Sequence, residues 1–271
     1  MKLRRKVEMV NRSEASSLRS QISIKFDPDI QELCQLIAHK GFCRMPAQHV
    51  RSLLLQQDPL SLHDWPAFQE SWLRLSLDGY MGDGGRYRKR RYATLSAKAS
   101  SLILQIEPHQ PHYQSRNYNQ LNGGVSRHFE PIEDSILRSN TMSSLLIFGC
   151  DLFGRLSPHS DWHIEVHQFR IEADGTQVAL PTPEGPHRDG VDFVIMLMVH
   201  RFNVVGGATT IYDLEDCRLG EFTLADPLEI VLVDDKRIRH AVAPIAPLDP
   251  DRSGYRDVFV ATFRDKSNLV Q

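Results

Sequence analysis

The second half of the sequence contains three side chains of types that bind transition metals. His187 and Asp189 lie two positions apart in the segment PEGPHRDGVDF. On an extended backbone, residues i and i+2 point to the same side, so an imidazole nitrogen and a carboxylate oxygen can converge on one ion. A second histidine, His240, follows 53 positions later (187 to 240) in RIRHAVAP. Two histidines and one carboxylate on one face of an ion leave its other positions open, as in non-heme Fe(II) sites.

The context of this H-x-D segment decides between a metal site and an ordinary loop histidine. A lone H-x-D is a weak signal, because the chain contains 12 histidines. Here the segment precedes a continuously apolar run, residues 193–199, and the distal histidine falls on a later predicted strand. His200 competes with His240, but it follows Asp189 too closely for the long return of the chain that a distal ligand requires. We therefore predict that His187, Asp189 and His240 bind the metal.

An oxygenase that uses 2-oxoglutarate also needs a cation for the far carboxylate of this co-substrate. Arginine suits the role because its planar fork makes two parallel hydrogen bonds to a carboxylate. Arg256 opens the segment RDVFVATF, and we predict that it has this role. The alternative for Arg256 is a surface ion pair with Asp257 or Asp251. Arg264 and Arg170 are then the candidates that remain.

The elements that must position these residues are short strands separated by turn residues. Close spacing of such strands favours a β-sandwich or barrel. The predicted strands are residues 162–171, 193–199, 209–212, 228–233, 238–243 and 258–263.

The N-terminal part has a different, helical character. Apolar residues recur at helical spacing after Asp27-Pro28 and after Pro46, and Trp65, Phe68 and Trp72 form a third stripe. We interpret this stripe as core packing and not as an aromatic binding site. Residues 132–153 also have a helical pattern.

These patterns predict three regions. Residues 1–24 are expected to be a flexible tail, because they are polar and lack periodicity. Residues 25–105 are expected to be a helical part packed on a barrel, and residues 106–271 the β core.

Composition limits the classes of function. With 271 residues and a net charge of −2, the chain suits one large domain without a field that attracts nucleic acid. The basic segment RYRKRR, residues 86–91, is typical of a solvated strand face, with one arginine available for a substrate carboxylate. No segment has the roughly 20 apolar residues that span a bilayer. The four cysteines form no CxxC pair, which favours a reducing, cytoplasmic compartment.

The segments HRDGVDFVIMLMVHRFNVVGGATTIYD, RHAVAPI and YRDVFVATFR resemble the 2-oxoglutarate/Fe(II) dioxygenase family that includes bacterial isoleucine 4-hydroxylases. The resemblance is clearest over residues 162–264, and GGRYRKRRYATL and NYNQLNGGVSRHFEPI extend it upstream. It implies a mainly β, α+β fold with a double-stranded β-helix core, also called a jelly roll or cupin-like barrel. It also implies Fe(II) on His187, Asp189 and His240, and 2-oxoglutarate on Arg256, with O2 as co-substrate.

The substrates that the resemblance implies are free aliphatic L-amino acids, hydroxylated at an unactivated C–H bond. Members differ in substrate, so the particular amino acid and the oligomeric state stay open. On strand 162–171, residues alternate between two faces, and either could line the barrel. His167 and Gln168, one from each face, are therefore our candidates for the substrate pocket.

Two other functions fit the same residues. One is a non-catalytic metal-binding barrel that senses or binds a ligand. The other is a hydrolase or isomerase that uses another divalent metal on this barrel. Such enzymes often use three or more histidines, and here no second histidine adjoins Asp189.

Overall fold

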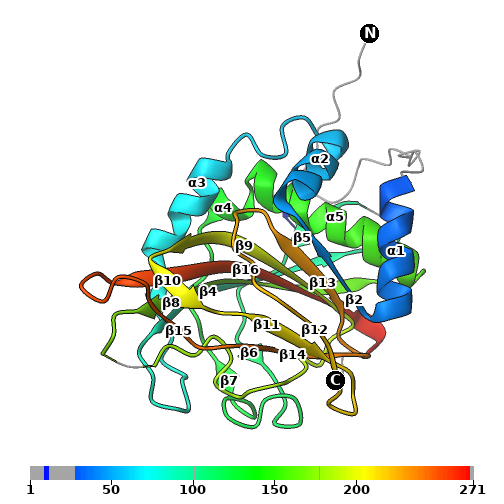
Figure 1. Cartoon of the computed structure of the whole chain (residues 1–271). Coiled ribbons are helices and arrows are strands. Elements are labelled where there is room, and N and C mark those ends of the chain that lie inside the picture. The colour runs from blue at the N-terminus through cyan, green and yellow to red at the C-terminus, as the bar shows by residue number, and fades with distance from the viewer. Residues whose placement is uncertain (1–8, 12–27, 100–101, 177, 269–271) are drawn as a thin grey trace.

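The computed structural model describes residues 9–11, 28–99, 102–176 and 178–268. Helices lie over one face of a large sheet, and short strands lie under its other face (Figure 1). The predicted α+β fold with a double-stranded β-helix core is confirmed by this arrangement. The large sheet contains, in spatial order, β1 (Met9–Asn11), β5 (Leu104–Ile106), β4 (Arg88–Ala97), β8 (Trp162–Ala173), β16 (Gly254–Asp265), β9 (Phe193–Phe202), β13 (Ile230–Asp234) and β2 (Phe42–Met45), with β3 (Ser76–Leu77) beside β4.

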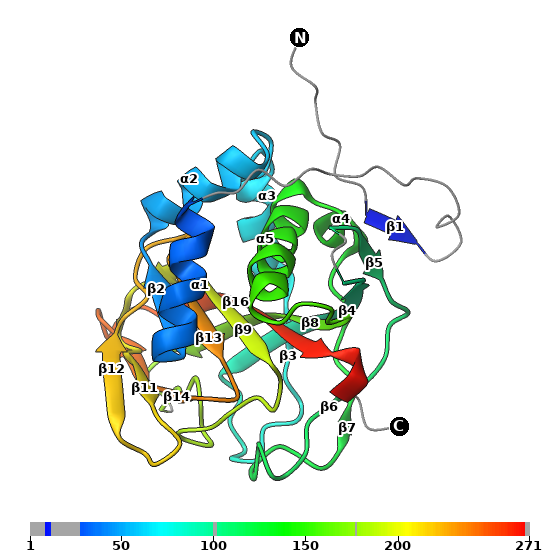
Figure 2. The same ribbon diagram turned by 90° about the vertical axis from the view of Figure 1, so that its right-hand side faces the viewer.

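Shorter strands face the large sheet and close the barrel on its lower side. β12 (Arg218–Phe222), β11 (Thr209–Tyr212) and β14 (Arg239–Val242) form one small antiparallel sheet. β10 (Val204–Gly206) pairs with β15 (Ile245–Pro247), and β6 (His112–Tyr113) pairs with β7 (Ser126–Arg127). In Figure 2, β6 and β7 lie on the side of the molecule opposite the helices.

The helices cover the outer face of the large sheet (Figures 1 and 2). They are α1 (Pro28–Lys40), α2 (Ala47–Gln57), α3 (Trp65–Glu70), α4 (Asp134–Leu137) and α5 (Asn140–Leu156), with short 3₁₀ turns η1 (Ser71–Arg74) and η2 (Lys266–Asn268). The predicted core role of Trp65, Phe68 and Trp72 is confirmed: all three are buried, and the ring centroid of Phe68 lies 6.0 Å from that of Phe259 on β16.

The alternation of side chains along β16 separates the core from the barrel interior. Phe259, Ala261 and Phe263 are buried against the helices, whereas Val258 and Val260 point into the barrel. This is the period of two that an extended strand imposes. The strands therefore offer a separate inner face for function while their outer face is committed to packing.

The continuous helix that we predict for residues 132–153 is divided in the structure. α4 ends at Leu137, and α5 begins after Ser139, whose hydroxyl accepts a hydrogen bond from the backbone N–H of Met142. A serine that caps the first turn in this way starts a new helix. The periodicity alone does not reveal the break, because apolar residues continue on both sides of it.

The predicted division at residue 105 does not separate helices from sheet. β2 pairs with β13, and β4 pairs with β8, so the N-terminal region contributes strands to the same large sheet. The predicted tail, residues 1–24, lies outside the described residues except for β1, which pairs in parallel with β5. An edge strand such as β5 has unpaired backbone groups that accept a further strand.

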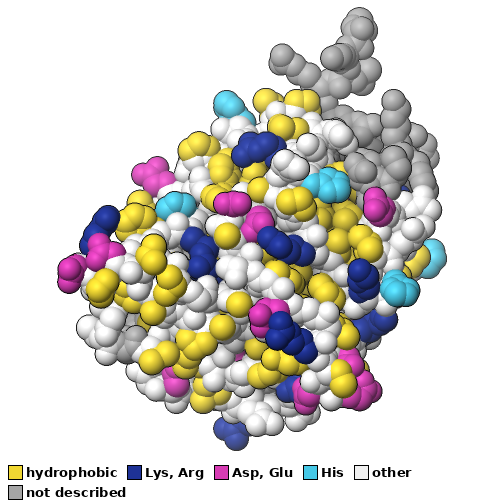
Figure 3. Space-filling view, viewed as in Figure 1, with side chains coloured by type: hydrophobic (Ala, Val, Ile, Leu, Met, Phe, Trp, Pro, Cys, Tyr) yellow, Lys and Arg dark blue, Asp and Glu magenta, His cyan; other side chains and the backbone are white. Residues whose placement is uncertain are grey.

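The surface carries mixed charges (Figure 3), and the cysteines form no disulfide bonds. Charged side chains of both signs are scattered among hydrophobic ones on the face shown in Figure 3. All four cysteines are free thiols. In the part of the chain that the structure describes, no helix is long and apolar enough to cross a membrane.

Candidate metal centre and substrate pocket

The two predicted metal-binding histidines are brought together by a direct backbone pairing. His187 and His240 form an isolated antiparallel bridge, in which the N–H of each donates to the carbonyl of the other at 3.1 and 2.9 Å. The bridge joins the segment of His187 to β14 and places the two imidazole ring centroids 4.5 Å apart. A separation of 53 positions in the chain (187 to 240) thereby becomes a contact between neighbouring side chains.

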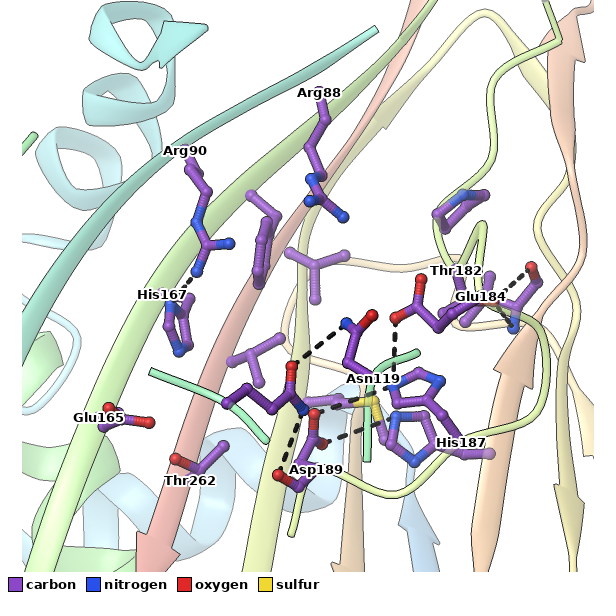
Figure 4. A pocket seen from close by; sticks show the side chains of 18 of the residues that line it. Arg88, Arg90, Asn119, Glu165, His167, Thr182, Glu184, His187, Asp189 and Thr262 are labelled. Atoms are coloured by element: carbon purple, nitrogen blue, oxygen red, sulfur yellow. Dashed lines mark hydrogen bonds and ion pairs between the residues drawn. The ribbon is translucent and has the colours of Figure 1, made fainter. Parts of the chain in front are cut away.

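Asp189 completes a compact group of ligand atoms with these histidines. Its Oδ1 lies 3.8 Å from Nε2 of His187, and its Oδ2 lies 3.8 Å from Nε2 of His240. One ligand atom from each of the three residues lies within 4.8 Å of the others. Figure 4 shows Asp189 and His187 directed at one another at the bottom of the pocket. The structure thus brings together the three residues that the sequence predicts as ligands.

Hydrogen bonds orient this group. Nδ1–H of His187 donates to the carbonyl oxygen of Gly185 at 3.0 Å, which leaves Nε2 as the free ligand nitrogen. The buried carboxylate of Asp235 accepts hydrogen bonds from the backbone N–H groups of Asp189, Gly190 and Val191 at 2.9, 2.7 and 3.0 Å. Asp235 therefore fixes the loop that carries Asp189.

The electrostatics of the group suit a cation. Burial and the neighbouring His187 hold the pKa of His240 well below its usual range, so its imidazole is neutral and able to coordinate. Burial lowers the pKa of His187, but the carboxylates of Asp189 and Glu184 outweigh this effect and raise it. Burial and repulsion from Asp189 raise the pKa of Asp235 to about 7. A bound divalent cation would relieve this accumulation of negative charge.

The donor set fits Fe(II). It consists of two imidazole nitrogens and one carboxylate oxygen from one side, the ligand set of non-heme Fe(II) oxygenases. Nε2 of His240 faces Asp189, and its buried Nδ1 has no hydrogen-bond partner among the described residues. The arrangement leaves the pocket side of the group open for other ligands.

Arg256 lines the same pocket, on the inward face of β16. It is buried, its Nε has no partner among the described residues, and burial and the nearby Arg201 lower its pKa to about 10. The alternative ion pair with Asp257 is not formed, because Arg170 takes that carboxylate in a two-pronged pair at 2.7 and 2.6 Å. A buried guanidinium without a carboxylate is suited to an anionic ligand.

The remaining candidates lie elsewhere. Arg170 and Arg264 do not line the pocket, and Arg170 is fully engaged by Asp257. His200 donates to or accepts from the Tyr255 hydroxyl at 3.1 Å and also lies outside the pocket lining. Of the two pocket candidates on β8, His167 lines the pocket, whereas Gln168 faces the helices and donates to the Ser71 hydroxyl at 2.7 Å. The pocket prediction for Gln168 is therefore wrong.

Two arginines of the basic segment 86–91 line the pocket, where we expect a solvated strand face. Arg88 and Arg90 point inward from β4 and are buried, and they lie 2.8 and 3.6 Å from the buried carboxylate of Asp78. Lys89 and Arg91 point outward. The sequence shows that alternate residues of this strand share a face. It does not show which face points inward, because that depends on the contacts of Arg88 and Arg90 with the buried Asp78.

A second cluster, His112, Glu165 and His167, also places its ligand atoms within 4.8 Å of one another. We interpret it as a hydrogen-bond network. Nη2 of Arg90 donates to Nδ1 of His167 at 2.6 Å, and the Tyr92 hydroxyl donates to Oε1 of Glu165 at 2.6 Å. The adjacent guanidinium disfavours another cation at this place.

The sequence did not identify further pocket residues in two other segments of the chain. Gln114, Asn119 and Arg127 come from the β6–β7 region, and Glu184 comes from the segment before His187. No local pattern identifies them, because their roles depend on contacts between distant segments. The PEG turn just before the H-x-D motif was the one available hint for Glu184.

Comparisons with known proteins agree with this site. A family model described as 2OG-Fe dioxygenase matches residues 69–262. Over 202 residues the chain is 25% identical to an L-isoleucine-4-hydroxylase of Bacillus thuringiensis, covering 73% of this chain and 82% of the relative. Over 242 residues it is 22% identical to a 3(1)-hydroxy-L-isoleucine 4-dioxygenase of Pantoea ananatis, covering 87% and 96%.

Solved structures show the same fold. The crystal structure of a bsmA homolog from Methylobium petroleophilum superposes with a TM-score of 0.79 at 33% identity, covering 91% of this chain and 97% of that one. The IDO protein of Bacillus thuringiensis superposes with a TM-score of 0.73 at 21% identity, covering 88% and 99%. The chain therefore belongs to the 2OG-Fe dioxygenase family, whose enzymes use Fe(II), 2-oxoglutarate and O2.

Proposed function

We propose that this dioxygenase hydroxylates an unactivated C–H bond of a free aliphatic L-amino acid of the isoleucine, leucine or methionine type. The observation that carries the proposal is the composition of the pocket. An apolar wall of Val191, Met196, Val258 and Val260 adjoins the metal-binding group, and charged side chains of both signs line the remainder. The two relatives described above, which act on isoleucine or a hydroxyisoleucine by their names, support the same substrate class.

In this proposal, His187, Asp189 and His240 hold Fe(II), and Arg256 binds the far carboxylate of 2-oxoglutarate. When bound, the iron with 2-oxoglutarate and O2 supplies the oxidation of the C–H bond, with release of succinate and CO2. The protein holds the two reactants in place and excludes water from the apolar wall. Arg256 does so by a charge-assisted pair inside a buried site, where such pairs are strong.

The test is a screen of the proteinogenic amino acids. Each is incubated with the Fe(II)-loaded protein, 2-oxoglutarate and O2, and succinate is measured. We expect an aliphatic amino acid to stimulate succinate release well above the level without substrate. Stimulation only by conjugated or polymeric substrates would overturn the proposed substrate class.

The second candidate function is a metal-binding barrel that senses or binds a ligand without turnover. The metal-binding group alone is compatible with it, and the free side of that group together with Arg256 favours the enzyme. A sensor would bind metal and ligand but release no succinate in the same screen.

The free thiols of all four cysteines also support a reducing, cytoplasmic location for the enzyme.

A further inference from the structure

We propose that Glu184 binds the α-ammonium group of the substrate and that Arg127, beside Arg88, binds its α-carboxylate. The enzyme then requires an amino acid in which both groups are free. This inference rests on the proposed function, which names the substrate class but not the residues that select it.

Glu184 is a buried carboxylate with an unused oxygen. Its side chain is 10% exposed, and its Oε2 is buried without a hydrogen-bond partner among the described residues. Its Oε1 lies 3.7 Å from Nε2 of His187. Figure 4 shows the carboxylate directed into the pocket between Arg88 and His187. A buried carboxylate oxygen without a donor is costly, so a donor that arrives with a ligand would be stabilised there.

Arg127 is the complementary cation. It is 2% exposed, and its Nε has no partner among the described residues. Its guanidinium donates a long hydrogen bond from Nη2 to Oε1 of Gln114, at 3.4 Å. The buried carboxylate of Asp78 lies against Arg88 and Arg90, and it forms no ion pair with Arg127. Burial and the positive charge of Arg88 lower the pKa of Arg127, as expected for a cation that lacks a close anion.

Two other charged groups of the pocket, Glu165 and Arg90, already have hydrogen-bond partners. Glu165 accepts hydrogen bonds from the Tyr92 hydroxyl at 2.6 Å and from His112 at 3.2 Å. Arg90 donates to His167, and its Cζ lies 3.6 Å from the ring centroid of Phe129 and 4.5 Å from that of Phe169. Apart from Arg256, which we assign to 2-oxoglutarate, and Nε of Arg90, the buried charged groups of the pocket with an atom unpartnered in the described part of the chain are Glu184 and Arg127.

Placing the ammonium group at Glu184 has a consequence for selectivity. Because Glu184 adjoins His187, the α-amino end of the substrate would lie near the metal-binding group, and an acyl group or peptide bond on that nitrogen would remove the positive charge. An amide at the other end would remove the charge that Arg127 pairs with. Each change leaves one buried charge on the protein unpaired, which costs affinity.

The experiment is a coupling cycle between one side chain and one substrate group. The protein loaded with Fe(II) and 2-oxoglutarate, without O2, is titrated calorimetrically with isoleucine, 3-methylpentanoic acid and isoleucinamide. We expect wild type to bind isoleucine about 30-fold or more tightly than either analogue. In Glu184→Gln, isoleucine should bind no better than 3-methylpentanoic acid. In Arg127→Gln, isoleucine should bind no better than isoleucinamide.

Glu165→Gln is the matched control, because it neutralises the other buried glutamate of the pocket. It should keep the preference for isoleucine over 3-methylpentanoic acid. Glu184→Gln should also keep the wild-type affinity for Fe(II). If Glu184 were a fourth metal ligand, this substitution would lower that affinity. A surviving ammonium preference in Glu184→Gln, a lost one in Glu165→Gln, or weaker Fe(II) binding in Glu184→Gln would each overturn the assignment.

The failure of the proposed function has a different signature. If wild type binds none of the free aliphatic amino acids and none stimulates succinate release, both proposals fall. If wild type binds and oxidises an amino acid while the cycle shows no coupling to Glu184, only the present inference falls.

Discussion

At the scale of single residues, the site is marked by buried polar atoms that have no partner in the described parts of the chain. Nε of Arg127, Nε of Arg256 and Oε2 of Glu184 are three such atoms, and all three belong to residues that line one pocket. Burying a polar group without a partner costs about 1–3 kcal/mol, so such atoms are rare unless a ligand or water satisfies them. Their concentration in one place points to ligands that the pocket was selected to hold.

Removing a metal ligand is expected to abolish turnover without unfolding the chain. Asp189→Ala and His187→Ala each delete one of three donors, and neither side chain belongs to the hydrophobic core. Fe(II) affinity should fall sharply in a metal titration, while circular dichroism should remain that of the wild type. Near-normal activity of either variant in a metal-replete assay would refute the ligand assignment.

Arg256→Ala is expected to weaken 2-oxoglutarate much more than it weakens iron. A buried carboxylate that loses its charged partner typically costs about 2–5 kcal/mol, roughly a 30-fold to several-thousand-fold loss of affinity. Titration with 2-oxoglutarate measures this loss. Arg264→Ala, which removes a half-buried arginine outside the pocket lining, is the control and should bind 2-oxoglutarate like the wild type. Unchanged affinity in Arg256→Ala would require another cation for this carboxylate.

At the scale of elements, the metal-binding group is assembled where two segments are tied together. The H-x-D segment pairs with the start of β14 through His187 and His240, and with the turn after β13 through Asp235. Gly190 has a φ of +79°, and a Cβ there would lie 2.4 Å from the ring of Tyr118. The loop can therefore pass between Asp235 and Tyr118 only with glycine at this position.

Asp235→Ala is expected to lower both stability and metal affinity. It leaves three buried N–H groups of residues 189–191 without an acceptor, which should reduce the free energy of unfolding by about 3 kcal/mol. Loss of a residue that orients metal ligands typically costs about 10–100-fold in metal affinity. Urea unfolding and metal titration measure the two effects.

The matched control is Asp213→Ala. Asp213 also accepts backbone hydrogen bonds, from Glu215 and Cys217, but in the exposed turn between β11 and β12. This variant should lose less stability and bind metal normally. Equal effects in the two variants would contradict a special role for Asp235.

Some features of these elements can be predicted from the sequence and others cannot. His187 and Asp189 could be predicted as a candidate ligand pair because they lie at i and i+2 before a buried strand, an arrangement that local geometry determines. The inward face of β8 could not be predicted, because both of its faces carry polar residues. Both faces are also buried, one against helices and one around the pocket. The roles of Arg127 and Asp235 depend on contacts between distant segments, which no local periodicity encodes.

At the scale of the whole molecule, the two faces of the large sheet have different tasks. The outer face packs against α1, α2, α3 and α5, and its core includes Phe153, Phe259 and Phe263. The inner face surrounds charged and unpartnered groups that repel one another or lack hydrogen bonds. The packing of the helices on the outer face thus stabilises the fold. It offsets the unfavourable free energy of the unpartnered and repelling charges that line the pocket.

Ligands that satisfy the pocket are therefore expected to stabilise the entire fold. Binding to the native state alone adds about 2.7 kcal/mol when the free ligand is at 100 times its Kd, which corresponds to a rise in Tm of about 5 °C or more for a domain of this size. Fe(II) and 2-oxoglutarate, added without O2, should produce this rise in wild type by differential scanning calorimetry. His187→Ala should not show it, and an equal rise in that variant would place the ligands elsewhere.

Our main proposal is that this pocket uses Fe(II), 2-oxoglutarate and O2 to hydroxylate a free aliphatic amino acid. It is tested most directly by mass spectrometry of a reaction run under isotopically labelled dioxygen, with the amino acid that best stimulates succinate release. We expect one labelled oxygen atom in the amino acid product and one in succinate, and neither product with His187→Ala. Unlabelled or absent hydroxyamino acid, alongside wild-type metal and 2-oxoglutarate binding, would contradict it.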